Sequence, residues 1–227
     1  MRQFETILLD IETQRDFFSS EGCCFDERGA AAARNIRKLF EWVRENHIPV
    51  LSTVLRVRLG EHGPLCPRTH CIEGTIGESK LDSTILADRQ NLGLLNTTDL
   101  PGNLFERHQQ VIIEKRDTDI FAHARAERLI TELTGGTFVI CGAGLAKGIV
   151  QAAVGLRTRG FSVILAQDAV LDLDDPLTEM ARLRMEAKGV VTAPTAEIIA
   201  PKPRRRPAYR PTTMKDLGLE QPGKKRR

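Results

Sequence analysis

Hydrophobic runs and helical periodicities alternate along the first 200 residues. Short apolar runs bounded by turn residues indicate strands, whereas apolar positions spaced i, i+3, i+4 and i+7 indicate helices. The runs predict strands over residues 4–10, 49–55, 110–115, 137–142 and 161–168, with a short one near 197–199. The helical spacing predicts helices over 29–47, 126–133, 149–156 and 176–188.

This alternation of strands and helices predicts a three-layer α/β/α fold around a mainly parallel sheet. Ligands of such folds bind at the carboxyl ends of the strands. Asp10, Lys115 and the turn from Gly142 to Gly148 all fall at such ends. Residues 56–109 are less regular and rich in Gly, Pro and polar residues, so we expect long loops over that edge.

The 227 residues divide into a body and a basic tail. The body, residues 1–200, is apolar enough to form a single domain, since 41% of the whole chain is hydrophobic. Residues 201–227 are rich in Pro, Arg and Lys, and we expect them to be disordered. They carry a net charge of +8 and the body −5, which suits contact with nucleic acid or another acidic partner, or simply a solvated extension.

Cellular location is predicted from what the sequence lacks. No apolar run approaches the 18 residues of a transmembrane helix, and the first residues do not resemble a signal peptide. The five cysteines are an odd number without regular spacing. They argue against a disulfide framework and for a reducing environment, so we predict a cytoplasmic protein without membrane contact.

The glycine-rich turn after the strand at 137–142 allows two local interpretations. Gly142, Gly144 and Gly148 open a helix, and Asp168 follows about 20 residues later, as in a dinucleotide-binding fingerprint. That motif usually opens its domain, whereas three predicted strands come before it here. The alternative is a turn that only links a strand to a helix.

Four sequence blocks resemble the isochorismatase-like hydrolases, a superfamily that includes nicotinamidases and other cysteine hydrolases. The blocks are ILLDIETQRDFF, CPRTHCIEGTIGESKL, VIIEKRDTDIFAHARAERL and CGAGLAKGIVQAAVGLRTRGFSVILAQDAV. Their order and spacing resemble this superfamily from about Phe4 to Ile199. The resemblance implies the isochorismatase-like α/β fold, a small-molecule substrate and assembly as a homo-oligomer.

The resemblance also implies a catalytic site with one residue missing. In the family an Asp, a Lys and a Cys converge, and the thiolate attacks the substrate. Asp10 and Lys115 match the first two positions, but Gly148 falls where the nucleophile belongs. The resemblance further places four residues near the substrate, and it implies a cis bond between residues 143 and 144. The four are Gln14, Phe18, Gly144 and Leu145.

A glycine at the nucleophile position excludes covalent thiol catalysis there, and Cys141 is expected to be a core residue. One consequence is non-covalent hydrolysis of a small metabolite, with Asp10 as the acid, as the resemblance to true isochorismatases implies. The other consequence is a catalytically inactive pseudoenzyme that serves in binding or assembly.

The metal site of nicotinamidase-like members also looks incomplete. Those proteins use an Asp-x-His pair after a Ser-Thr strand, together with a histidine that His70 matches. Leu55 and Val57 occupy the pair's positions here and cannot bind a metal. His62, Cys66, His70 and Cys71 could form a replacement set, although ordinary loop roles explain them too. We therefore expect neither a metal nor another cofactor.

Overall fold

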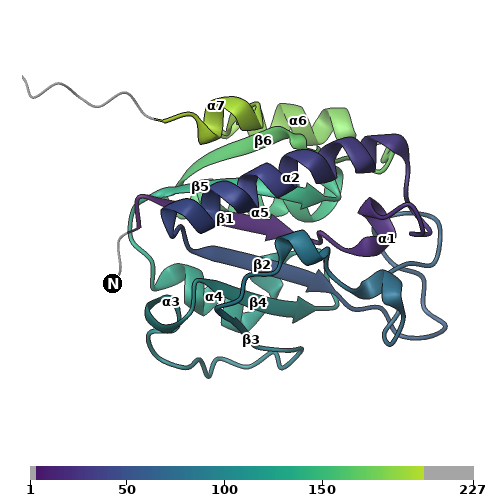
Figure 1. Cartoon of the computed structure of the whole chain (residues 1–227), viewed down its shortest axis with the longest axis horizontal. Coiled ribbons are helices and arrows are strands. Elements are labelled where there is room, and N and C mark those ends of the chain that lie inside the picture. Colours follow the sequence, from purple (N-terminus) through teal and green to yellow (C-terminus); the bar gives the residue numbers. More distant parts are fainter. Residues whose placement is uncertain (1–3, 202–227) are drawn as a thin grey trace, which may run out of the picture.

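A computed structural model describes residues 4–201, which fold around a seven-stranded sheet (Figure 1). The strand order is β3-β4-β2-β1-β5-β6-β7, and all neighbouring strands are parallel. The strands are β1 (Thr6–Ile11), β2 (Val50–Leu55), β3 (Arg89–Asn91), β4 (Gln110–Lys115), β5 (Thr137–Ala143), β6 (Ser162–Leu171) and β7 (Val191–Ala193). The predicted α/β fold with a parallel sheet is thus confirmed.

The helices lie in layers on both faces of this sheet. They are α1 (Arg15–Phe18), α2 (Glu27–Asn46), α3 (Leu104–Arg107), α4 (Ala124–Thr131), α5 (Val150–Thr158), α6 (Thr178–Ala187) and α7 (Thr195–Ile199). Single turns of helix are η1 (Ile76–Glu78), η2 (Asp82–Thr84), η3 (Ile120–Ala122) and η4 (Leu145–Ile149). In Figure 1, α2 crosses the near face of the sheet.

Two hydrophobic clusters, one on each face, hold the layers together. Residues of α2 pack against Leu8, Val50 and Val139, with α7 at the edge of this cluster. Residues of α4, α5 and α6 pack with Leu9 and Ile113 on the other face. Because both faces of the central strands are covered, these strands are nearly continuous apolar runs.

The long helix α2 shows how local sequence sets its bounds. Asp26 precedes the helix, and its carboxylate accepts a hydrogen bond from the backbone N–H of Gly29 at 3.0 Å. The buried stripe includes Ile36 and Phe40. The helix ends at Asn46, and the next residue, His47, has a left-handed backbone (φ 51°) that turns the chain toward β2.

The structure corrects two predicted elements near the chain's edges. The segment near residues 197–199 was expected to be a strand but belongs to α7, and the edge strand β7 comes earlier. Strand β3 lies within the region predicted as loops, and its three residues are too polar to show an apolar run. Apart from Pro201, the predicted tail lies outside the described residues. Within residues 4–201 no helix is long and apolar enough to cross a membrane.

Candidate active site at the carboxyl edge of the sheet

Glu12 and Lys115 form a buried ion pair where β1 and β4 end. The Lys115 Nζ lies 2.7 Å from Glu12 Oε1, and both side chains are at most 2% exposed. Thr53 of β2, the strand between them, donates its hydroxyl proton to the same carboxylate oxygen at 2.8 Å. Three parallel strands therefore bring an acid, an ammonium and a hydroxyl together at their carboxyl ends.

The two charged groups differ in how fully they are hydrogen-bonded. Besides Glu12, the Lys115 ammonium donates to the carbonyl oxygens of Asp117 (2.7 Å) and Thr118 (2.9 Å), so each of its three protons has an acceptor. The second carboxylate oxygen, Glu12 Oε2, is buried without a hydrogen-bond partner. Glu12 is thus held by one oxygen while the other stays free.

Gly148 lies next to this free oxygen. A Cβ atom added to Gly148 would sit 3.2 Å from Glu12 Oε2 and 3.0 Å from the Thr118 carbonyl oxygen. The position aligned with the family's nucleophile is therefore in contact with the acid and with the loop that holds Lys115. Gly148 thus lies beside two of the oxygen-bearing groups that bind the Lys115 ammonium, the Glu12 carboxylate and the Thr118 carbonyl.

The predicted partner of Lys115, Asp10, lies on the opposite face of the sheet, and this expectation is corrected. Asp10 is in register with Ser52, which is in register with Ile112, so these three residues share a face. Lys115 lies three residues after Ile112 and points to the other face, because strand side chains alternate.

Asp10 instead belongs to a second buried pair, below α2. Its Oδ2 accepts from the Ser52 hydroxyl (2.8 Å) and from the ammonium of Lys80 (2.6 Å), which also donates to the hydroxyl of Thr13. Its Oδ1 is buried without a partner. Cys141, in register with Asp10, is fully buried, and burial raises the pKa of its thiol well above the usual range. A protonated core thiol is a poor nucleophile, so this cysteine does not replace the missing one.

Glu12 was missed because its backbone breaks the alternation of β1. A strand would place Glu12 on the same face as Asp10, two residues earlier. Its φ of 45° lies in the left-handed region, which costs a non-glycine residue about 1–2 kcal/mol. The nearest signal in the sequence was its place two residues beyond the predicted strand 4–10, close to the expected functional edge of the sheet.

The glycine turn between β5 and η4 is shaped by close backbone contact. Gly142 has a φ of 127°, and a Cβ there would lie only 1.7 Å from the carbonyl oxygen of Ile11. Gly144 also has a positive φ, and a side chain there would collide with Leu65, which covers the turn. The bond between residues 143 and 144 is trans, contrary to the expectation from resemblance.

The other residues predicted to lie near the substrate, Gln14, Phe18 and Leu145, make contacts that hold the fold together. The Gln14 amide donates to the carbonyl oxygens of Leu55 and Glu78 and accepts from the Leu55 N–H, so it fixes the end of β2. Phe18 and Leu145 are 4% and 1% exposed and belong to the two hydrophobic clusters.

Asp168, the acidic residue that the dinucleotide-binding interpretation requires, is engaged elsewhere in the fold. Asp168 lies inside β6 rather than at its end. Its carboxylate accepts from both the backbone N–H (2.8 Å) and the hydroxyl (2.7 Å) of Thr195, at the start of α7. This acid therefore holds α7 in place.

Among the hollows of the described residues, one lies beside the ion pair and another, described below, lies far from it. Lys115 lines a cavity of about 190 Å³ together with Asn96, Asp119 and His123. The imidazole of His123 is 4% exposed, and neither of its nitrogens has a hydrogen-bond partner. Burial, with the nearby charges of Arg125 and Lys115, lowers the pKa of His123, so the ring is neutral at pH 7.

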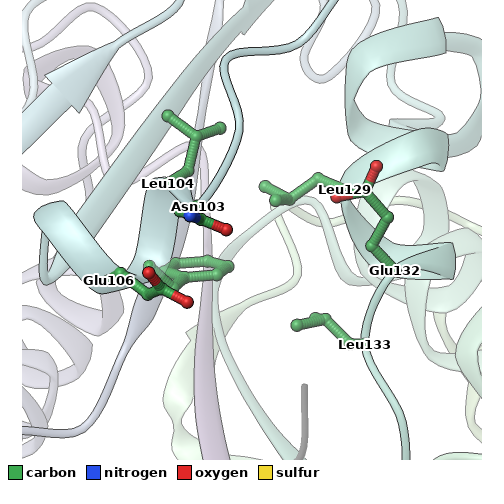
Figure 2. Close-up of a pocket in the computed structure, with 7 residues that line it drawn as sticks. Asn103, Leu104, Glu106, Leu129, Glu132 and Leu133 are labelled. Carbon is green, nitrogen blue, oxygen red and sulfur yellow. The ribbon is translucent and has the colours of Figure 1, made fainter. Parts of the chain in front are cut away.

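The second hollow, shown in Figure 2, measures about 320 Å³ and lies between α3 and α4. Leu104 and Leu129 line it from the two helices. Because α3 precedes β4 and α4 precedes β5, it lies at the amino ends of the strands, away from Glu12. It is therefore not part of the candidate active site.

The nicotinamidase-type metal site does not fit this chain. Leu55 is buried at the end of β2 and Val57 is buried two residues later, and neither side chain can bind a metal. His70 packs against the ring of Phe17, with 5.4 Å between ring centroids. The predicted replacement set also changes, because Cys71 is a buried free cysteine and Cys66 forms a disulfide with Cys24. The disulfide corrects the expectation that the cysteines are free.

Comparison with known proteins agrees with this architecture. Residues 6–197 match the family model described as an isochorismatase domain. A search of curated proteins finds no match. Among solved structures, nicotinamidase from Bacillus subtilis is 21% identical with a TM-score of 0.60, and the match covers 84% of this chain and 99% of that one.

Two further structures match at similar coverage. For N-carbamoylsarcosine amidase from Thermoplasma acidophilum the identity is 15% and the TM-score 0.60, over 85% of this chain and 97% of that one. For an isochorismatase family protein from Desulfovibrio vulgaris the values are 17% and 0.63, over 86% and 96%. At these identities the structures establish a common fold.

Proposed function

Because this chain belongs to the isochorismatase family, we propose that it hydrolyses a small molecule without a covalent intermediate, with Glu12 as the group that transfers protons. This proposal moves the acid from Asp10, which faces α2, to Glu12, which faces Lys115 and Gly148. It keeps the idea that a glycine at the nucleophile position leaves water as the attacking group.

The observation that carries the proposal is the free carboxylate oxygen of Glu12 beside residue 148. Asp10 Oδ1 is also buried without a partner, but Asp10 pairs with Lys80 on the other face of the sheet. The free Glu12 oxygen is buried, has no partner, and points to the position where a side chain at residue 148 would begin. A buried polar atom without a partner is costly, and such atoms in native proteins call for a functional explanation. An oxygen that must exchange protons with water or substrate has to remain free in the resting state.

The neighbouring residues have supporting roles. Lys115 and Thr53 hold Glu12 Oε1, so the carboxylate cannot rotate and Oε2 keeps its direction. The cavity beside Lys115 gives a small molecule room, and the neutral ring of His123 offers it a hydrogen-bond donor and an acceptor. Glu12 and Gly148 do not line this cavity, so the proposal requires the loop at residues 117–118 to move for the molecule to reach Glu12 Oε2.

Water attacks as Glu12 Oε2 takes its proton, and Glu12 then returns that proton to the leaving group. For a vinyl ether the order is reversed: the form of Glu12 that carries a proton on Oε2 gives it to the alkene carbon, and the water that then attacks returns a proton to Glu12.

The test is an activity screen with matched variants. The panel contains nicotinamide, N-carbamoylsarcosine, simple amides and isochorismate, so that amide and vinyl ether substrates are both represented. Glu12→Gln should lower kcat by about 10²–10⁴-fold, the usual contribution of acid–base catalysis. Glu132→Gln, half-exposed directly after the end of α4, is the control and should leave kcat unchanged. Equal turnover by Glu12→Gln and the parent protein would contradict the proposal.

A second candidate, a catalytically inactive binding or assembly protein, rests on the Lys115 ammonium. Its three protons are all bound within the chain, so it has none left for a substrate. This candidate predicts no turnover on the panel, together with a stable oligomer or a copurifying partner. Light scattering measures the oligomer, which stays a prediction, as do a cytoplasmic location and binding of nucleic acid by residues 201–227. Loss of nucleic-acid binding as salt rises to about 0.2 M would support the last of these.

A further inference from the structure

Three potential metal ligands from two loops meet beside α1. Cys24 lies just before α2, and Cys66 and His70 lie in the loop after β2. The two sulfurs form a disulfide, and the Cys66 Sγ is 3.4 Å from His70 Nδ1. All three ligand atoms lie within 4.8 Å of one another. None of the three takes part in the ion pair or the hydrogen bonds described above for Glu12 and Lys115.

We propose that, once the Cys24–Cys66 disulfide is reduced, these two cysteines and His70 bind one zinc-like divalent cation. The ligand types are those that zinc prefers, two thiolates and an imidazole. With Zn–S near 2.3 Å and Zn–N near 2.0–2.1 Å, tetrahedral ligand atoms stand about 3.5–3.8 Å apart. The 3.4 Å between Cys66 Sγ and His70 Nδ1 already approaches this spacing. Opening the S–S bond would let the sulfurs separate to it.

The disulfide and the metal site exclude each other chemically. A dithiol reductant supplies two electrons and two protons, which break the S–S bond and give two thiols, while the reductant becomes a disulfide. The cation then displaces both thiol protons to solvent. The oxidised sulfurs carry no thiolate charge and offer the cation no comparable site.

His70 has to adjust in the same step. Its Nδ1 lies 2.7 Å from the carbonyl oxygen of Arg68, and its Nε2 accepts from the N–H of Leu65 at 3.2 Å. Binding through Nδ1 moves the ring proton to Nε2, so both backbone groups must turn away. Arg68 is exposed, which leaves its carbonyl free to find water.

Cys23 remains outside the set and leaves the fourth coordination position open. Its thiol donates to the carbonyl oxygen of Thr69 at 3.0 Å. The Cys23 Sγ lies 3.8 Å from the Cys24 Sγ, so the Cys23→Ser variant tests whether this thiol joins the set. Three protein ligands with an open position occupied by water make a known zinc arrangement.

The experiment measures bound metal directly and does not depend on any hydrolase activity. The full chain is reduced with a phosphine, which takes up the oxygen of one water molecule and leaves two thiols, and is then incubated with Zn²⁺, dialysed and analysed by mass spectrometry of the metal. We expect about one Zn²⁺ per reduced chain and almost none after oxidation with glutathione disulfide, as three-ligand coordination requires. Co²⁺ in place of Zn²⁺ should give a thiolate-to-metal charge-transfer band only in the reduced protein.

Variants separate this site from its neighbours. Cys24→Ser, Cys66→Ser and His70→Gln should each lose stoichiometric zinc, whereas Cys23→Ser should keep it. Far-UV circular dichroism verifies that each variant is folded. The proposal is overturned if the reduced parent protein binds no zinc, if the oxidised protein binds as much, or if Cys23→Ser loses zinc as completely as Cys24→Ser. Retention of zinc by the Cys24→Ser and Cys66→Ser variants would overturn it as well.

Discussion

Removing Lys115 should destabilise the protein far more than removing Glu12. In Lys115→Met the Glu12 carboxylate remains fully buried and loses the ammonium 2.7 Å away, keeping only the hydroxyl of Thr53. Breaking a buried ion pair in this way costs about 3–5 kcal/mol. In Glu12→Gln the ammonium keeps the carbonyl oxygens of Asp117 and Thr118 and gains an amide oxygen, so we expect a loss of about 1–3 kcal/mol.

Urea unfolding, followed by circular dichroism and by the fluorescence of the single tryptophan, measures both losses. For a chain of this size, 3–5 kcal/mol lowers Tm by about 6–20 °C. Arg128→Met is the control, because Arg128 and Glu132 form a pair that is about half exposed and worth less than about 1 kcal/mol. The double variant Glu12→Gln/Lys115→Met should lose less than the sum of the single losses. A loss below about 1 kcal/mol in Lys115→Met would refute the reasoning, because it would mean that water screens the pair.

Three further predictions concern the turn, the buried histidine and the disulfide. Gly148→Ala should fold, with a loss of about 1–3 kcal/mol in unfolding free energy, because its methyl group meets a carbonyl oxygen at 3.0 Å. Gly142→Ala should give no folded protein, because its methyl group would lie 1.7 Å from a carbonyl oxygen. Expression and circular dichroism show whether each variant folds. The pKa of His123 is lowered in the folded protein, so the unfolded chain binds a proton more readily and stability falls as pH drops below about 6.5. In His123→Asn, the change in Tm between about pH 7.5 and 5.5 should be smaller than in the parent protein. With a chelator present, reducing the bond between Cys24 and Cys66, 42 residues apart, should lower the unfolding free energy by about 4 kcal/mol, and an unchanged urea midpoint would contradict this.

The sequence predicted the fold well because each central strand is a compact apolar run. QVIIEK was predicted with the bounds that the structure shows for β4. The exposed edge strands β3 and β7 have three residues each, too few for a pattern to stand out. Helix α7 was taken for a strand because five residues are too short to show helical periodicity.

The site was only half predictable because the face of each strand depends on register. Lys115 and Gly148 follow from motif positions, and in the structure both lie next to Glu12. Whether Asp10 shares a face with Lys115 depends on how β1, β2 and β4 align, which no local pattern gives. The sequence does not predict the positive φ of Glu12 either, because glutamate rarely adopts that conformation. The Cys24–Cys66 contact joins two irregular loops, so spacing could not reveal it.

The contact between Leu65 and Gly144 has a kinetic consequence. Leu65 fills the space that a side chain at Gly144 would take, and its neighbour Cys66 is tied to Cys24. A molecule approaching the turn from that side must first push this leucine aside, and the covalent tether resists the movement. Oxidised and reduced protein should therefore differ in the association rate constant for such a ligand, even where the final complex is equally tight.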